Sequence, residues 1–226
     1  MEATREVYCE DAVTWMQSHT AIPGASTVAS LPDISEFNNT SLEDWKKWFV
    51  NTAALVMACA DPNCVSVFYQ SDIKLDGVWV DKGFLIQQAA LLQGVELLWH
   101  KIVCRSPLDT ITHGRPAYSH LLCFSKNLRI SDYSRATADV IYDESDKTWV
   151  RGMGLETCKK VVNFIMSHTE TKVLLNPFCG EGAVLAVANS LGLNVVGIER
   201  SPKRANKARR QKVSANGQSW FLENEV

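Results

Sequence analysis

Residues 173–210 read VLLNPFCGEGAVLAVANSLGLNVVGIERSPKRANKARR, and this stretch decides the fold. The apolar run at its start predicts a buried parallel strand. The turn that follows contains Gly180 and Gly182, and glycine allows a backbone to bend sharply and to approach a ligand closely. A helical segment and a second apolar run come next, and the second run ends at Glu199. The order strand, glycine turn, helix, strand and acid predicts one unit of a dinucleotide-type sheet.

The glycine turn and Glu199 are expected to lie side by side, because the carboxyl ends of neighbouring parallel strands meet at one edge of a sheet. A carboxylate there suits a pair of ribose hydroxyls, so the pattern favours a nucleoside ligand. The turn has two glycines where a full dinucleotide fingerprint has three, and it lacks the Lys-Ser or Lys-Thr pair of a triphosphate-binding loop. The alternative is that Gly180 and Gly182 are ordinary turn residues and that Glu199 is a solvated strand end.

Composition indicates a single globular domain over residues 1–226. The chain is 46% hydrophobic and 21% charged, and it contains no apolar stretch of membrane-spanning length. Its N-terminal residues are polar and acidic, so we expect no signal peptide and no membrane partner. The seven cysteines show no CxxC spacing, which favours buried free thiols in a reducing compartment over a metal site. We therefore expect an intracellular protein, cytoplasmic, with a nuclear location left open.

Charge gives no general attraction to nucleic acid, because the net charge is −2. Basic residues are nevertheless concentrated in 203–212, and they recur along 101–135. A solvated helix face is the usual explanation of such a run, and a local phosphate-binding surface is the alternative.

Strands alternate with helices along most of the chain, which predicts an α/β class with a mostly parallel sheet. The expected strands lie near 5–9, 26–30, 64–69, 95–103, 118–125, 172–176 and 194–199. The expected helices cover 12–18, 41–58, 84–92, 155–168 and 183–190, and a further helix after Glu199 carries the basic run over 203–212. Residues 127–146 are polar and are expected to be irregular.

Five segments, taken together, resemble motifs of one enzyme family, the S-adenosylmethionine-dependent amino-group DNA methyltransferases. The segment NPFCGEGAVLAVANSLGLNVVGIERSPKRANKAR resembles the family's cofactor motif, which begins DPFxGSGTT, and YCEDAVTWMQS resembles its GDALExL segment. ASLPD falls where the family has its catalytic SPPY, DPPY or NPPY, while LLWHK and YSHLLCFSK resemble two further strands. The likeness covers nearly the whole chain. Members of this family methylate exocyclic nitrogens of adenine or cytosine.

The resemblance implies a Rossmann-like methyltransferase fold with a seven-stranded, mostly parallel sheet in the order 3-2-1-4-5-7-6, in which strand 7 is antiparallel. Strands 1 and 2 would be 172–176 and 194–199, and strand 3 would be 5–9. The catalytic-type half, 1–148, precedes the cofactor-binding half, 149–226. This order corresponds to the circularly permuted arrangement of the family.

The cofactor that the resemblance implies is S-adenosyl-L-methionine. Its methionine and ribose parts would be lined by residues of the cofactor motif, namely Asn176, Phe178, Gly180 and Gly182. Glu199 is implied to bind the ribose hydroxyls, and Asp11 is implied to reach the adenine amino group. Segment 151–155 resembles the part of the family that closes over the methionine.

The implied catalytic residues are Ser30, Leu31, Pro32 and Asp33, and here the chain departs from the family. In the family, the first side chain and a following backbone carbonyl accept hydrogen bonds from the target amino group, and an aromatic fourth residue stacks on a flipped base. Asp33 cannot stack, but its carboxylate could be a general base or an acceptor for the amino protons. Phe37 is a candidate for the missing aromatic face, with a core or rim position as the alternative. The SLPD turn is also compatible with a methyltransferase that has lost or changed its activity.

The resemblance implies a methyltransferase that acts on a nucleobase amino group, with RNA or DNA as its nucleic-acid partner. Two loops supply the candidate substrate contacts outside the SLPD region: His113, Arg115 and Tyr118 in and after the loop over 105–117, and Arg129, Tyr133 and Arg135 in the loop over 127–148. A solvated loop position is the alternative for each of them. Short loops favour a structured RNA, a small substrate, or recognition supplied by a protein partner or a homodimer. Two alternatives stay open. One is a catalytically silent cofactor-binding or scaffold subunit, and the other is a methyltransferase that acts on protein or on a small molecule.

Overall fold

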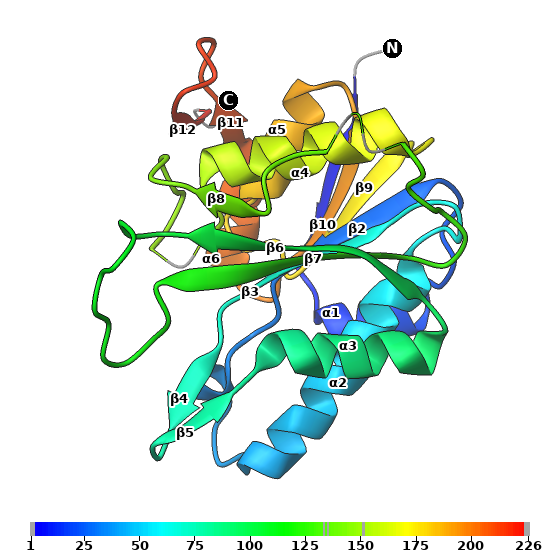
Figure 1. Cartoon of the computed structure of the whole chain (residues 1–226). Helices are drawn as coiled ribbons and strands as arrows, with labels where there is room; N and C mark the ends of the chain where they lie inside the picture. Colours follow the sequence, from blue (N-terminus) through cyan, green and yellow to red (C-terminus); the bar gives the residue numbers. More distant parts are fainter. Residues whose placement is uncertain (1–2, 133, 135, 151, 224–226) are drawn as a thin grey trace.

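A sheet of eight strands forms the centre of the molecule, with helices on both of its faces (Figure 1). The computed structural model describes residues 3–132, 134, 136–150 and 152–223. From one edge to the other, the strands are β1 (Arg5–Tyr8), β10 (Asn194–Ile198), β9 (Val173–Pro177), β2 (Ala25–Ala29), β3 (Ser66–Gln70), β7 (Tyr118–Ser125), β6 (Glu96–Cys104) and β8 (Val140–Tyr142). The predicted α/β class with a large, mostly parallel sheet is confirmed.

Strand β7 runs antiparallel to both of its neighbours, β3 and β6, and the other pairs in this sheet are parallel. The seven strands expected from the sequence lie side by side in the expected order. The expected number of strands is wrong, because β8 pairs with β6 and comes from 127–146, which were expected to be irregular. Only Ile141 of this three-residue strand is buried, so it carries too little apolar alternation to be seen in the sequence.

Each helix occupies a position expected from the sequence, including α6, which carries most of the basic run after Glu199. The helices are α1 (Ala12–Gln17), α2 (Leu42–Cys59), α3 (Lys82–Gln93), α4 (Leu155–His168), α5 (Ala183–Ser190) and α6 (Pro202–Arg210), with a 3-10 helix, η1 (Ile34–Glu36), after β2. Asp81 accepts the backbone N–H of Phe84 at 2.8 Å. This cap starts α3 two residues earlier than expected, and it brings Lys82 into the helix.

Two small hairpins stand apart from the main sheet. They are β4 (Ile73–Leu75) with β5 (Val78–Val80), and β11 (Gln211–Val213) with β12 (Trp220–Leu222). The second hairpin is tied to the segment before α4, because Trp220 Nε1 donates to the backbone oxygen of Asp146 at 3.1 Å. Neither hairpin was expected, since each strand is only three residues long.

The helices form two layers, with α1, α2 and α3 on one face of the sheet and α4, α5 and α6 on the other (Figure 1). Successive strand residues point to opposite faces, so β3 contributes to both layers. Val67 packs in one apolar cluster with Val161 of α4, whereas Phe68 packs in the other with Trp45 and Phe49 of α2. The sheet is therefore covered on both faces, and its open side for ligands is the edge where the parallel strands end.

All seven cysteines are free thiols, and five of them are buried. Burial raises the pKa of the Cys59 thiol to about 12, so this side chain is protonated and unreactive at neutral pH. In the part of the chain that the structure describes, no helix has the length and apolar character needed to cross a membrane.

Candidate active site

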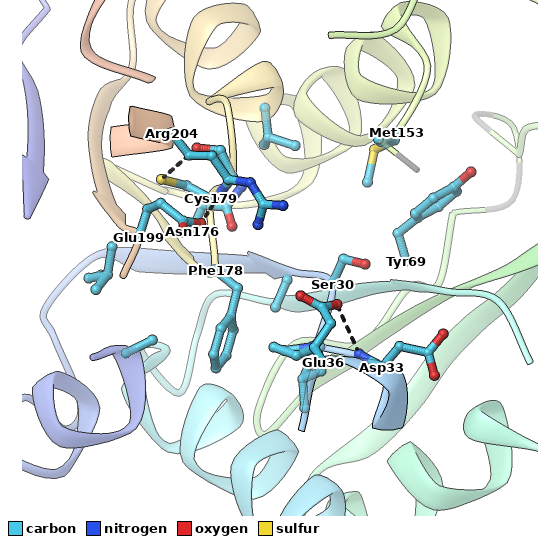
Figure 2. Close-up of a pocket in the computed structure, with 18 of the residues that line it drawn as sticks. Ser30, Asp33, Glu36, Tyr69, Met153, Asn176, Phe178, Cys179, Glu199 and Arg204 are labelled. Carbon is cyan, nitrogen blue, oxygen red and sulfur yellow. Dashed lines mark hydrogen bonds between the residues drawn. The ribbon is translucent and has the colours of Figure 1, made fainter. Parts of the chain in front are cut away.

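A cavity of about 450 Å³ lies at the carboxyl ends of β2, β3, β9 and β10 (Figure 2). Residues from both halves of the chain line it. Of the residues predicted from the sequence, the cavity brings together Asp11, Ser30, Leu31, Pro32, Asp33, Phe37, Asn176, Phe178, Gly180 and Glu199. Of the others, Gly182, His113, Arg115, Tyr118 and Arg129 are not among its lining residues, and Tyr133 and Arg135 lie outside the described residues. Ligands of open parallel sheets bind at this kind of edge, so the cavity is the candidate site.

The glycine turn and Glu199 lie against each other, as the sequence predicts. Glu199 Oε2 accepts a hydrogen bond from the Gly180 backbone N–H at 3.1 Å, and Oε1 accepts one from Ser201 at 2.8 Å. The backbone N–H groups of Phe178 and Cys179 both donate to the carbonyl oxygen of Ile198. These bonds hold the turn to the end of β10 and fix the direction of the carboxylate.

Phe178 is held in an unusual backbone conformation, with φ at +97°. Residues other than glycine rarely adopt positive φ, and such conformations persist mainly where the surroundings enforce them. Here the two hydrogen bonds to Ile198 enforce it. The result is that the ring of Phe178 faces the cavity (Figure 2).

Asn176 presents a hydrogen-bond acceptor to the cavity. Its side chain is 6% exposed, and its Oδ1 atom has no hydrogen-bond partner among the described residues. Buried amide oxygens nearly always have a donor, so a donor on a ligand would complete this site. Asp11 lies on the same cavity, and its Oδ1 caps α1 by accepting from the backbone N–H of Thr14 at 2.9 Å. Oδ2 is therefore the Asp11 oxygen that a ligand donor would use.

Gly182 serves packing between two helices and does not face the cavity. It begins α5 with φ at +83°, and a Cβ atom there would lie 2.7 Å from the Cα atom of Ala208 in α6. The resemblance to the cofactor motif predicted that Gly182 lies beside the cofactor. In the structure, its missing side chain instead allows α5 and α6 to approach each other.

Replacing Gly182 by Ala is expected to cost about 2 kcal/mol more stability than replacing Gly94 by Ala. Both glycines have positive φ, so both variants carry the left-handed strain of a Cβ atom. At Gly94 no described atom lies within 4 Å of the added carbon, whereas at Gly182 it meets the backbone of Ala208. Urea denaturation of both variants measures the difference. Equal losses would show that α6 moves aside without cost.

The SLPD turn places two hydrogen-bond acceptors at the end of β2. Ser30 follows the strand directly, and its exposed side chain lies at the cavity (Figure 2). The carbonyl oxygen of Leu31 accepts from Gln70 Nε2 at 3.1 Å, which fixes the backbone of the turn to the end of β3. A carbonyl oxygen has two lone pairs, so this one can accept a second hydrogen bond.

Asp33 is held between two cations. Lys82 Nζ lies 3.4 Å from Asp33 Oδ1, and a guanidinium nitrogen of Arg115 lies 3.7 Å from Oδ2. Oδ1 is buried and, within the described part of the chain, accepts no hydrogen bond in good geometry. The backbone N–H of Asp33 donates to Glu36 Oε1 at 3.2 Å. The carboxylate is thus oriented by charge, and its Oδ1 atom has no hydrogen-bond partner in good geometry among the described residues.

Lys82 is a site residue that the sequence did not indicate. It lines the cavity although it is 2% exposed, and its Nζ lies 5.6 Å from the ring centroid of Trp45. Burial lowers the pKa of Lys82, and the charge of Asp33 only partly offsets that effect. Lys82 and Asp33 are far apart in the chain, and a lysine in the first turn of a helix gives no local signal of such a role.

The three substrate contacts expected near the loop over 105–117 separate in the structure. Arg115 reaches the site through Asp33, His113 is exposed and away from the cavity wall, and Tyr118 points into a polar cluster behind it. In that cluster the Tyr118 hydroxyl donates to Asp72 Oδ2 at 3.4 Å. Of the three, only Arg115 is placed to influence a ligand, and it does so through Asp33.

The cluster behind the site is built on the buried carboxylate of Asp72. His120 Nε2 lies 2.9 Å from Asp72 Oδ2, and His100 Nε2 lies 2.9 Å from His120 Nδ1. Asp72 Oδ1 accepts the backbone N–H of Lys82 at 2.8 Å. Burial tends to raise the pKa of Asp72, but the hydrogen bonds from His120 and Lys82 outweigh it and lower the pKa. The cluster therefore fixes the start of α3 and, with it, the position of Lys82.

Aromatic rings form a second wall of the cavity. The rings of Phe37 and Trp48 meet edge to face with centroids 4.6 Å apart, and the rings of Trp48 and Phe178 have centroids 6.5 Å apart. All three residues line the cavity. Phe37, predicted as a substitute for the missing aromatic of the SLPD turn, thus lies in the site together with Trp48. A flat aromatic ligand suits such a wall.

The segment between β8 and α4 supplies the remaining wall. Thr148, Trp149, Gly152 and Met153 line the cavity, and residue 151 lies outside the described residues. The guanidinium carbon of Arg204, from α6, lies 5.0 Å from the ring centroid of Trp149. This cation–π contact joins the segment to the cofactor-binding half of the chain. Gly152 and Met153 of the segment 151–155 line the cavity, and the closing of this segment over the methionine part of the cofactor stays a prediction.

No known protein family and no curated protein matches this chain in comparisons of sequence. Solved structures do match. One is a Thermus thermophilus protein assigned as a DNA modification methylase and solved with S-adenosyl-L-methionine, at 17% identity over 91% of each chain, with a TM-score of 0.71. PvuII DNA methyltransferase, specific for cytosine N4, matches at 14% identity over 100% of this chain and 89% of its own, with a TM-score of 0.72.

A third match is M1.HpyAVI in complex with S-adenosylmethionine, at 16% identity over 91% of this chain and 98% of its own, with a TM-score of 0.59. Nearly the full length of each of these proteins is covered. At such low identities the likeness concerns the fold. The chain has the fold of solved DNA methyltransferases.

Proposed function

We propose that this chain is an S-adenosyl-L-methionine-dependent methyltransferase that modifies an amino group of a nucleobase in RNA or DNA. The observation that carries the proposal is the shared cavity into which Asn176, Glu199 and the SLPD turn all face. The fold supports it, because the similar structures are DNA methyltransferases and two of them hold S-adenosylmethionine. The order of the segments along the chain agrees with the circularly permuted arrangement.

The residues of the cofactor-binding half fit this cofactor. Glu199 would accept the ribose hydroxyls, Asp11 Oδ2 the adenine amino group, and the unpartnered Asn176 Oδ1 a donor on the methionine part. Gly180 lets the backbone pass close to the ligand. When bound, the cofactor supplies an electrophilic methyl group, whose transfer to an amino nitrogen leaves a neutral thioether and one proton.

The catalytic-type half would hold the target amino group. Ser30 Oγ and the second lone pair of the Leu31 carbonyl oxygen can accept its two hydrogens, which raises the electron density on the nitrogen. The hydrogen bond from Gln70 keeps the carbonyl in place. The rings of Phe37 and Trp48 offer a face for a base that has left its stack. Solvent at the exposed Ser30 provides a route for the released proton.

A second candidate function is a cofactor-binding subunit without catalytic activity. It is favoured by Asp33, which stands where the family has an aromatic residue and is engaged by Lys82 and Arg115. Such a subunit would act with a protein partner or within a homodimer. An intracellular location, cytoplasmic or nuclear, agrees with the free thiols.

Transfer of a labelled methyl group separates these possibilities. The protein is incubated with labelled S-adenosyl-L-methionine and with tRNA, rRNA, DNA or protein in separate reactions, and cofactor binding is measured by calorimetry. Label in a nucleobase supports the proposed function, and label in protein assigns the chemistry to another substrate. Micromolar binding with no transfer supports the silent subunit. If the cofactor does not bind at all, both functions are wrong.

A further inference from the structure

The SLPD turn offers an unusual series of hydrogen-bonding groups to a base. Ser30, Leu31 and Asp33 all line the cavity and supply, in chain order, a hydroxyl oxygen, a carbonyl oxygen and a carboxylate. Ser30 and Asp33 are labelled in Figure 2. All of these groups accept hydrogen bonds when the serine hydroxyl donates elsewhere. A base bound along these groups must therefore present two donor groups side by side.

Asp33 has the capacity to take part in such a contact. Its two ion pairs, at 3.4 Å to Lys82 and 3.7 Å to Arg115, are longer than typical hydrogen bonds, so they balance its charge while leaving room for a further donor. Oδ1 is buried against Lys82, and the side chain as a whole is 12% exposed. Oδ2, on the side of Arg115, is thus the oxygen that a donor on the ligand would reach.

Among the four bases, only guanine has a ring N–H group next to an exocyclic amino group. In adenine and cytosine the ring nitrogen beside the amino group is an acceptor, which would face the carboxylate of Asp33 across an unfavourable contact. In guanine the 2-amino group is followed by N1–H and then by the acceptor O6. This order of donor, donor and acceptor complements the protein groups in turn. The 2-amino group matches the acceptors of Ser30 and Leu31, N1–H matches the Asp33 carboxylate, and O6 matches the ammonium group of Lys82.

We infer that the base held at this end of the cavity is guanine, with its 2-amino group at Ser30 and Leu31, its N1–H at Asp33 and its O6 toward Lys82. This inference rests on the proposed function and narrows its substrate. It also explains why Asp33 replaces the aromatic residue of the family motif, since an aromatic residue at position 33 could not accept a hydrogen bond from N1–H. Stacking is provided instead by Phe37 and Trp48, which come from the end of η1 and from α2 rather than from the turn.

The identity of the methylated base tests the inference in the unaltered protein. Total RNA and genomic DNA are treated with the protein and labelled S-adenosyl-L-methionine, digested to nucleosides and separated. The expected product is N2-methylguanine. Label in N6-methyladenine or N4-methylcytosine would overturn the guanine assignment while the proposed function stands. Absence of label from every nucleobase would overturn the proposed function, and the guanine assignment with it.

A variant measures the part played by Asp33. Asp33→Asn alone would leave the buried charge of Lys82 without its partner, so the double variant Asp33→Asn/Lys82→Met is the better test. Its transfer to guanine is expected to fall about 10- to 100-fold, because a charged hydrogen bond to N1–H and a donor to O6 are lost. Its affinity for S-adenosyl-L-methionine, measured by calorimetry, is expected to stay within about threefold, since neither residue is placed at the cofactor.

The matched control is Glu43→Gln, an acid-to-amide change in the exposed first turn of α2. It is expected to retain full transfer to guanine. A double variant that folds, as judged by its circular dichroism, and still methylates guanine at more than about a third of the original rate would show that Asp33 does not read the base. Loss of cofactor binding in the double variant would contradict the placement of these residues at the substrate end.

Discussion

Replacing Glu199 by Gln is expected to weaken the binding of S-adenosyl-L-methionine at least about 100-fold. The carboxylate of Glu199 accepts backbone N–H groups from Gly180 and Ser201 with its two oxygens. An amide turns one of these acceptors into a donor, so an N–H group would face another N–H group. The variant therefore loses an acceptor for the ribose hydroxyls and also the bond that holds the glycine turn. Isothermal titration calorimetry measures the dissociation constant directly.

The control for this loss is Glu43→Gln, because the Glu43 side chain is 72% exposed and makes only a 3.9 Å ion pair with Lys47. Its affinity for the cofactor is expected to equal that of the unaltered chain. Circular dichroism of the Glu199 variant establishes that its sheet is intact. Cofactor affinity within about threefold of normal in a folded Glu199→Gln protein would place the ribose elsewhere.

The cofactor-binding half could be predicted from the sequence because its geometry is local. Gly180 and Glu199 belong to one strand–helix–strand unit, and the right-handed crossover of such a unit places turn and acid at adjacent strand ends. The hydrogen bond from the Gly180 N–H to Glu199 follows from that placement. Gly182 is different, since its neighbour Ala208 belongs to α6, a helix whose packing against α5 no local pattern predicts. A glycine pattern does not distinguish close approach to a ligand from close approach to a helix.

The proposed substrate end of the cavity could be predicted only in part, because it is assembled from distant segments. Ser30 and Asp33 were found through the likeness of one short turn to a family motif. Lys82 and Trp48 were not selected, since each stands in an ordinary amphipathic helix and reaches the cavity only through the packing of α2 and α3 below the sheet. Strands shorter than four residues, such as β8, could not be predicted, because so few residues show no detectable alternation of apolar and polar side chains.

Asp33 illustrates how a long-range contact changes the meaning of a sequence difference. In the sequence, Asp33 stands where the family has an aromatic residue, and a carboxylate cannot stack on a base. That difference suggested that Asp33 is a general base or an acceptor for the amino protons, or that the activity has been lost. In the structure it is a carboxylate balanced by Lys82 and Arg115, two cations that no local pattern connects to it. Under the proposed function, Phe37 and Trp48, whose rings meet at the cavity, would form the stacking surface instead. The proposed function therefore needs residues from other segments to take the place of the motif's aromatic residue.

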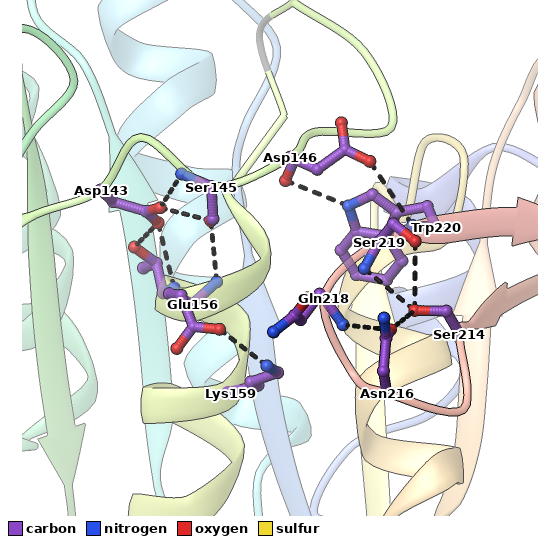
Figure 3. A network of polar contacts seen from close by, with 11 residues as sticks. Asp143, Ser145, Asp146, Glu156, Lys159, Ser214, Asn216, Gln218, Ser219 and Trp220 are labelled. Atoms are coloured by element: carbon purple, nitrogen blue, oxygen red, sulfur yellow. Dashed lines mark hydrogen bonds and ion pairs between the residues drawn. The ribbon is translucent and has the colours of Figure 1, made fainter.

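Replacing Asp143 by Asn is expected to destabilise the protein by roughly 3–5 kcal/mol at neutral pH. The Asp143 side chain is buried before α4 and accepts hydrogen bonds from the backbone N–H and hydroxyl groups of both Ser145 and Thr157 (Figure 3). An amide group would present a donor to some of these four donors and leave them unsatisfied in the interior. A Cβ atom at Gly154 would overlap this carboxylate, so the surroundings cannot rearrange easily. Thermal unfolding is expected to occur about 10 °C lower.

The control is Asp139→Asn, the same chemical change two residues from Ile141, the central residue of β8. The Asp139 side chain is 86% exposed and pairs with Lys101 at 3.0 Å, so its loss is expected to cost no more than about 1 kcal/mol. Because Asp143 fixes the segment that carries Trp149 and Met153 into the cavity, the Asp143 variant is also expected to bind the cofactor more weakly. The Asp139 variant is expected to bind it normally.

The stability difference between the unaltered protein and the Asp143→Asn variant should depend on pH in a defined direction. Burial tends to raise the pKa of Asp143, but the hydrogen bonds from Ser145 and Thr157 outweigh it, so the pKa lies below its ordinary value. A carboxyl group with a lowered pKa in the folded state stabilises that state above the unfolded pKa, near about 4, and loses this effect as the pH falls through the folded pKa. The difference in unfolding free energy should therefore be complete at about pH 7 and shrink below about pH 4. Urea titrations of both proteins at about pH 7, 5 and 3 measure it. A constant difference at all three values would mean that the carboxylate charge is not what holds the start of α4.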